Sequence, residues 1–293
     1  MIGKVIILLL LAVGISFSTV PSYATIGGSN AGYSRSYAIE KVTDNVFAAI
    51  AQPRGKAASN AVIVVTGTQV VIMGAHFVPD SISELMEEVG KITTAPVATV
   101  ILTHHHRGYN YVDYDFPLGI QIVTSWQTWQ TLKESYRELK NPVIFFDKSL
   151  TLRLGKTTIV ASNLGRGHGD GDVVVYLPEE KVLFTSDLFF NNVIGYMGDG
   201  YLREWVLNLE MLEGLDTRFV VPGLGKVTDS EAIGRFRVFF TDFTTEMLHY
   251  LEKKKTLEQT KKNFRLPKYE SLPGYREFFN QNIERAYRQL KDQ

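Results

Sequence analysis

The sequence predicts a layered α/β protein in which strands and helices occur in mixed order along the chain. Short apolar runs typical of buried strands are found at 61–65, 70–73 and 96–102. Segments with apolar residues at helical spacing, such as 80–92 and 229–251, lie between and after them. Both kinds of element in mixed order are typical of sheets packed against helices.

The first 24 residues have the features of a signal peptide. Lys4 precedes an apolar run over 5–13, and residues 22–24 (Ser-Tyr-Ala) place small side chains where a signal peptidase cuts. The run is shorter than the about 20 residues that a membrane span needs. We therefore expect residues 1–24 to be removed, leaving no stable membrane anchor and a periplasmic or secreted protein.

The composition limits the kinds of function. The chain contains no Cys, so its stability must come from a hydrophobic core and not from disulfides. It has 31 basic and 31 acidic residues, and this balance argues against nucleic acid or an anionic membrane surface as a partner. Nothing in the sequence indicates an oligomeric state.

The N-terminal half is expected to contain a loose arm, β-structure and one helix. Residues 25–40 are rich in Gly and Ser and are predicted to form the arm. Strands are expected over 42–51 and 60–75, the latter with a hairpin turn at 66–69. Asp80 is expected to N-cap a helix that ends near Ile92.

The remaining elements follow from the same patterns. We expect a strand over 96–102, a helix over 125–139, strands near 151–162, 172–177 and 181–185, a helix over 204–215 and a strand over 218–221. The last two strands of the middle group are joined by a turn at 178–181. From 229 the pattern is helical, and its aromatic stripe predicts a packing face; a further helix is expected over 274–290.

Histidine is scarce, and four of the six histidines fall in two short clusters. His104 and His106 are two residues apart, so on an extended segment they point the same way and can share one cation. His168 can add a third nitrogen. His105 is expected to point away, while His76 and His249, which have no partner motif, are expected to be ordinary histidines.

Taken in order, several motifs resemble the metallo-β-lactamase superfamily. They are Thr103-His-His-His106, Gly167-His-Gly-Asp-Gly-Asp172 leading into 173–187, and Val220-Val-Pro-Gly-Leu-Gly225. The first is particularly like glyoxalase II, and the whole set is also similar to class B β-lactamases. The resemblance implies a four-layer αββα sandwich over 25–228, with a C-terminal helical extension over 229–293 packed on the same domain.

The resemblance also implies a metal centre with one complete position. His104, His106 and His168 match the first zinc position, and Asp187 matches the bridging acid. Three imidazoles with an open fourth position form a catalytic zinc arrangement. Asp187 is expected to orient the zinc-bound water, to act as general base or to become a fourth metal ligand.

The second metal position is predicted to be lost. Gly108 stands where the family has an Asp, and Tyr109 and Leu224 stand where it has histidines. Gly74 replaces the acid that usually ends the early hairpin. Because a single carboxylate holds a divalent cation weakly, we expect one zinc ion.

These residues predict a hydrolase that uses a single zinc-bound hydroxide on a small-molecule ester, thioester, lactone or β-lactam. The alternative is a non-catalytic relative that acts as a binding or accessory protein. An aromatic run, Tyr109, Tyr111, Tyr114 and Phe116, either lines a substrate pocket or fills the space of the missing ligands. Gly167, Gly169 and Gly171 are expected to serve tight backbone turns around His168.

Overall fold

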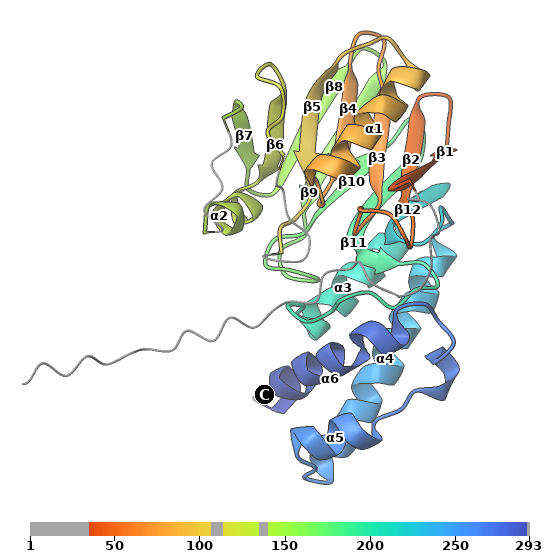
Figure 1. Ribbon diagram of the computed structural model, residues 1–293. Coiled ribbons are helices and arrows are strands. Elements are labelled where there is room, and N and C mark those ends of the chain that lie inside the picture. The colour runs from red at the N-terminus through yellow and green to blue at the C-terminus, as the bar shows by residue number, and fades with distance from the viewer. Residues whose placement is uncertain (1–34, 107–113, 135–139, 292–293) are drawn as a thin grey trace, which may run out of the picture.

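Two β-sheets lie face to face, and helices cover the outer face of each (Figure 1). The computed structural model describes residues 35–106, 114–134 and 140–291. The first sheet has seven strands in the order β1-β2-β3-β4-β5-β6-β7. Their bounds are β1 Tyr37–Lys41, β2 Val46–Ala51, β3 Ala61–Val65, β4 Val70–Gly74, β5 Val97–Leu102, β6 Gln121–Ser125 and β7 Val143–Phe146.

The second sheet has five strands in the order β12-β11-β10-β9-β8. They are β8 Ser149–Leu154, β9 Thr157–Asn163, β10 Val173–Leu177, β11 Val182–Phe190 and β12 Phe219–Leu224. Neighbours pair antiparallel except β11 and β12, which are parallel. In the first sheet the pairs from β1 to β4 are antiparallel and those from β4 to β7 are parallel.

Three hydrophobic cores separate the four layers. Because side chains alternate along a strand, Ile63 of β3 faces helix α1 (Pro79–Ile92), whereas Val62 and Val64 face the second sheet. This burial on both faces explains the continuous apolar run of β3. The outer face of the second sheet packs on α3 (Leu202–Glu213) and α4 (Glu231–Glu252). The predicted four-layer αββα sandwich is confirmed.

The C-terminal helices extend beyond one end of the two sheets (Figure 1). After α4 come α5 (Leu257–Asn263), a short 3₁₀ turn over Pro267–Tyr269, and α6 (Tyr275–Lys291). The predicted aromatic stripe of α4 is buried: Phe240 lies 4.7 Å from Trp205 of α3, and Phe243 lies 5.2 Å from Phe264, between ring centroids. The helical extension thus shares the core that covers the second sheet.

Two predictions for the N-terminal half were wrong. Residues 37–40 of the predicted arm over 25–40 belong to edge strand β1, because Tyr37 is buried and β1 pairs along its length with β2; residues 25–34 lie outside the described part. Helix α1 begins at Pro79, with Val78 and not Asp80 at the N-cap. Proline suits the first helical turn, since its ring fixes φ at a helical value. A backbone N–H at this position would have no acceptor within the helix, so proline loses no hydrogen bond there.

Other elements differ in number from the prediction. The segment 151–162 holds two strands and not one, since Gly155, with φ of 65°, forms a turn between β8 and β9. Strands β6 and β7 were missed. Helix α2 (Trp126–Glu134) confirms the start of the predicted helix, and residues 135–139 lie outside the described part. Within the described ranges, no helix combines the length and apolar character needed to cross a bilayer.

Candidate metal centre

Three histidines predicted as metal ligands converge at the ends of strands from both sheets. His104 and His106 follow β5, and His168 lies in the segment before β10. One nitrogen of each imidazole lies within 4.8 Å of the others, and all three side chains are buried. The structure therefore brings together residues that are some sixty positions apart in sequence, as predicted.

Thr103 fixes where the histidine segment leaves the first sheet. Its backbone N–H donates to the Gly74 carbonyl at 3.0 Å, and its carbonyl accepts from the Val173 N–H at 2.9 Å. Gly74 ends β4 of the first sheet, whereas Val173 begins β10 of the second. These two bonds tie the segment to both sheets and place His104 between them.

Some ring nitrogens of these histidines have a hydrogen-bond partner, and others have none among the described residues. His106 Nδ1 lies 2.8 Å from Asp199 Oδ2, and His104 Nδ1 lies 3.3 Å from the Thr103 hydroxyl. In contrast, His106 Nε2 and both ring nitrogens of His168 are buried and have no hydrogen-bond partner in the described part of the chain. Buried nitrogens without partners are costly unless a ligand satisfies them, so this donor set fits a bound metal.

The protonation state suits metal binding as well. Burial, together with the neighbouring imidazoles of His106 and His104, holds the pKa of His168 well below its ordinary value. His168 is therefore neutral at physiological pH and offers a lone pair. Metal ligands need this form, because a protonated imidazole cannot coordinate.

Asp187 completes the cluster from strand β11. Its Oδ2 lies 3.5 Å from His104 Nε2 and 3.7 Å from His168 Nε2, and the side chain is buried. Two ligand atoms bound tetrahedrally to one zinc, each about 2.0–2.1 Å from it, lie about 3.3–3.4 Å apart. The carboxylate thus lies close to the separation that a fourth ligand would have.

Aromatic side chains form the wall behind His168. Its ring lies 5.2 Å from that of Trp205 and 6.0 Å from that of Phe190. Trp205 is itself fixed by its indole N–H, which donates to the Leu188 carbonyl at 2.7 Å. The His168 ring therefore packs on a buried, apolar surface.

The glycines around His168 lie in a run of backbone bends over 166–171, in agreement with the predicted tight turns, and they also allow close packing. None of the three has a positive φ. A Cβ on Gly171 would lie 2.3 Å from Gln127 Cβ, and one on Gly169 would lie 3.2 Å from His106 Nε2. Their lack of a side chain allows the segment to approach α2 and the metal site.

The positions expected for a second metal are partly described. The Phe77 ring fills the space beside Gly74, where an added Cβ would meet it at 3.0 Å. Leu224 is half-buried and packs on the core around α4. Gly108 and Tyr109 lie outside the described residues, as does Tyr111.

The described part of the aromatic run packs into the first core. Phe116 is buried and lies 5.7 Å from Phe77, and Tyr114 lies 5.2 Å from Phe116, between ring centroids. These two residues thus agree with the packing interpretation of the run.

The other histidines take no part in the three-nitrogen cluster. His105 is buried, and desolvation lowers its pKa to about 4. His76 is buried too; its Nδ1 accepts from the Ala58 N–H at 3.2 Å, and burial lowers its pKa to about 4 against the opposing charge of Asp187. His249 lies on α4, 3.4 Å from Glu246. His76 therefore interacts electrostatically with Asp187 of the site, although the sequence showed no partner motif for it.

Two acidic residues at the site were missed by sequence reasoning. Asp199 is the partner of His106. Asp172 is buried beneath the His168 segment, where its Oδ2 accepts from the Gly169 N–H at 3.0 Å. Burial raises the pKa of Asp172 to about 7. Neither residue follows a spacing that marks metal ligands, so only the three-dimensional arrangement identifies them.

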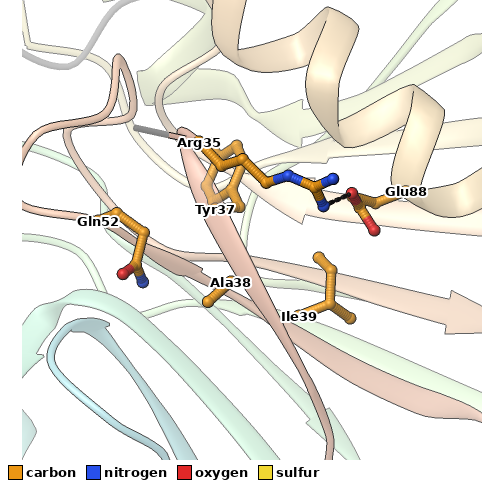
Figure 2. Close-up of a pocket in the computed structure, with 6 residues that line it drawn as sticks. All are labelled: Arg35, Tyr37, Ala38, Ile39, Gln52 and Glu88. Carbon is orange, nitrogen blue, oxygen red and sulfur yellow. Dashed lines mark hydrogen bonds and ion pairs between the residues drawn. The ribbon is translucent and has the colours of Figure 1, made fainter. Parts of the chain in front are cut away.

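A separate surface hollow of 360 Å³ lies at the edge formed by β1 and α1. Figure 2 shows its lining, in which Arg35 Nη1 pairs with Glu88 Oε1 at 2.7 Å. The full set of lining residues is Arg35, Tyr37, Ala38, Ile39, Gln52 and Glu88. None of them belongs to the histidine cluster, so the cluster remains the candidate site.

Comparisons with known proteins agree with this geometry. The family model of the metallo-beta-lactamase superfamily matches residues 54–224. A metallo-beta-lactamase type 2 of Bacteroides fragilis is 28% identical over 203 residues, 66% of this chain and 80% of the relative. One from Bacillus sp. (strain 170) is 28% identical over 177 residues, 58% of this chain and 68% of the relative.

Solved structures show the same fold. A metallo-beta-lactamase from Pontibacter korlensis superposes with a TM-score of 0.58 at 23% identity, covering 70% of this chain and 99% of its own. The seven- and five-stranded sheets with their outer helices therefore match an experimentally known architecture.

Proposed function

Because this chain belongs to the metallo-beta-lactamase superfamily, a family of hydrolases that implies zinc, we propose that it is a hydrolase with one zinc ion at His104, His106 and His168. One observation carries the proposal: three buried imidazoles converge within 4.8 Å, and nitrogens of two of them have no hydrogen-bond partner among the described residues. Burying polar nitrogens without hydrogen-bond partners costs free energy, and a non-catalytic protein of the same fold would gain nothing from it. The hydrolase is therefore favoured over a non-catalytic relative.

A bound zinc and the residues of the chain would supply different parts of the hydrolysis. Zinc in a three-histidine site lowers the pKa of bound water to about 7 and polarises carbonyl oxygens. Asp187 is the catalytic residue of the chain: its carboxylate orients the attacking water, takes its proton and returns that proton to the leaving group. Its position 3.5 Å and 3.7 Å from two imidazole nitrogens supports this role.

We propose one zinc and not two. The half-buried Leu224 stands at the position of the family's last histidine and has no atom that coordinates a metal. Phe77 fills the space next to Gly74. Gly108 and Tyr109 stand at two further positions where the family has ligands of the second metal. Of the residues at these positions, Asp187 alone is of the family's ligand type.

The substrate is a small molecule with a carbonyl that water can attack. The curated relatives quoted above are named metallo-beta-lactamases, and a β-lactam is therefore the first compound to test, followed by a lactone, a thioester and an ester. We further propose that residues 1–24 direct export and that the mature hydrolase, 25–228 with its helical extension 229–293, acts outside the cytoplasm. The apolar run after Lys4 supports export.

Metal content and turnover test the proposal together. Protein purified from zinc-replete medium should contain close to one equivalent of zinc by elemental analysis, and His168→Ala should lose it together with hydrolysis. His249→Ala, on the exposed side of α4, is the matched control and should keep both. Zinc below a tenth of an equivalent in the unmodified protein would rule the proposal out. One equivalent of zinc without turnover of any of the four substrate classes would favour the accessory protein.

A further inference from the structure

The segment between β11 and α3 lies between the metal site and the C-terminal helix α6. On one side, Asp199 Oδ2 is 2.8 Å from His106 Nδ1. On the other side, the backbone of the same segment is bonded by side chains of α6. We refer to residues 194–202 as the bridging segment, because it connects the extension with a metal ligand.

The contact with Asp199 determines which nitrogen of His106 is available. The Asp199 carboxylate is an acceptor, and its Oδ2 lies 2.8 Å from His106 Nδ1. His106 therefore carries its proton on Nδ1 and leaves the lone pair on Nε2, the buried nitrogen without a hydrogen-bond partner in the described part of the chain. Carboxylates that bond the outer nitrogen of a ligand imidazole fix its tautomer and orientation in this way.

Tyr196 supports the same carboxylate. Its hydroxyl donates to Asp199 Oδ2 at 3.4 Å. The Tyr196 ring also stands edge-on to His106, with centroids 6.1 Å apart. Two residues of the bridging segment thus contact one metal ligand.

Helix α6 holds the bridging segment with a row of polar side chains. Asn282, which is 1% exposed, accepts from the Met197 N–H at 2.8 Å and donates to the Gly195 carbonyl at 3.0 Å. Arg285 donates to the Gly200 carbonyl at 2.7 Å and to the Asp199 carbonyl at 3.4 Å. Gln289 accepts from the Leu202 N–H at 3.0 Å. These positions, three and four residues apart, lie on one face of the helix.

The residues that come directly before α6 also contact the bridging segment. The Ile194 N–H donates to the Pro273 carbonyl at 2.9 Å. Gly274, with φ of 79°, lies so close to Ile194 that a Cβ would come 2.0 Å from the Ile194 carbonyl oxygen. The bridging segment is therefore bonded to the extension from Ile194 to Leu202. The family match ends at residue 224, so all of these anchors lie beyond it.

We infer that the C-terminal helix α6 positions a metal ligand. Asn282 and Arg285 fix the bridging segment, and Asp199 acts as a positioning residue that orients His106 with Nε2 toward the metal. This inference rests on the proposed zinc site. It assigns to the extension a role in metal affinity that is additional to its share of the hydrophobic core.

The test combines zinc affinity with a measurement on the metal-free protein. Asp199→Ala should weaken zinc binding, measured by competition with a chromophoric chelator, about 10- to 100-fold. Arg285→Met should weaken it by a smaller factor and should add little in the Asp199→Ala background, because both changes act through one contact. Arg288→Met, the same change on α6 at an exposed residue that pairs with Glu284, is the control and should leave affinity unchanged.

Nitrogen-15 NMR of the metal-free protein gives the second measurement. His106 should show a protonated Nδ1 and an unprotonated Nε2 in the unmodified protein and in Arg288→Met, and this pattern should be lost in Asp199→Ala. Unchanged zinc affinity and an unchanged tautomer in Asp199→Ala would overturn the role of Asp199. Wild-type affinity in Arg285→Met and also in Asn282→Ala would overturn the role of α6. If the unmodified protein binds no zinc, the proposed function fails, while the tautomer still tests the positioning.

Discussion

The hydroxyls of Thr103 and Ser186 lie 2.8 Å apart in the buried space between the two sheets. Each precedes a residue of the candidate site, His104 or Asp187, and Ser186 has a positive φ of 47°. We expect Thr103→Val to lower the free energy of unfolding by about 1–3 kcal/mol, because Ser186 loses a buried partner. Urea unfolding measures this. Thr151→Val, on an exposed position of β8, should change little, and an equal loss in both would contradict the specific role.

Gly223 provides the space in which Asp187 lies. A Cβ at Gly223 would come 2.2 Å from Asp187 Oδ1 and 2.7 Å from the Asp187 Cα. Since backbone cannot move as easily as a side chain, Gly223→Ala should destabilise the protein by about 1–3 kcal/mol and weaken zinc binding. Gly67→Ala has no atom within 4 Å of the new Cβ and is the control. Thermal unfolding with chelator titration checks both effects, and a fully stable Gly223→Ala would show that Asp187 lies elsewhere.

Asp187→Asn should separate metal binding from turnover. The amide keeps nearly the same shape but cannot take a proton, so kcat should fall about 10²- to 10⁴-fold. Zinc content by elemental analysis should stay near that of the unmodified protein, because the three imidazoles remain. If kcat is unchanged while zinc is retained, Asp187 is not the base. If zinc is lost, Asp187 is a required ligand.

Restoring the missing ligands should create a second metal position. The combined change Gly108→Asp, Tyr109→His and Leu224→His supplies the donors that the family resemblance identifies as absent. Bound zinc, measured by elemental analysis, should rise from about one equivalent towards two. Two equivalents in the unmodified protein would show that the assignment of one zinc is wrong.

Asp172 makes the stability of the metal-free protein depend on pH. Burial raises the pKa of Asp172 from 3.8 to about 7, so between these values the folded protein keeps a proton that the unfolded chain has released. Stability from this group is therefore present at low pH and is lost as pH rises through about 7. Asp172→Asn does not ionise, and its stability relative to the unmodified protein should increase from pH 5 to pH 8.

The size of this increase follows from the shift. Of the shift of about three pKa units, the part above pH 5 is about two units, which corresponds to an upper limit of about 3 kcal/mol. Urea unfolding at both pH values measures it, and contributions of the other titrating groups are common to both proteins. A difference that is constant with pH would mean that Asp172 is ionised throughout.

Elements with a strong pattern were predictable, and those defined by their neighbours were not. The hairpin of β3 and β4 and helix α1 follow from apolar runs and helical spacing. Strand β1 was missed because most of its residues are exposed, and its structure comes from pairing with β2. Strand β7 was missed because its residues Val143–Phe146 are only four in number.

The site residues also differ in whether a local pattern or distant contacts define them. His104, His106 and His168 were identified because their spacing and flanking glycines form motifs. Asp199 belongs to no motif, and its role arises from a segment placed by Asn282 and Arg285, more than eighty positions later in the chain. Long-range positioning of this kind leaves no local pattern in one sequence.

The arrangement of the histidines has a consequence for a chain that contains no cysteine. His104 follows β5 of the first sheet and His168 lies between β9 and β10 of the second, so a metal held by both would join the two sheets as a covalent cross-link does. Such a link closes a loop of about sixty residues, which restricts the unfolded chain as a disulfide does. Unlike a disulfide, it opens on exposure to a chelator and not to a reductant, so metal supply would set the lifetime of the folded protein.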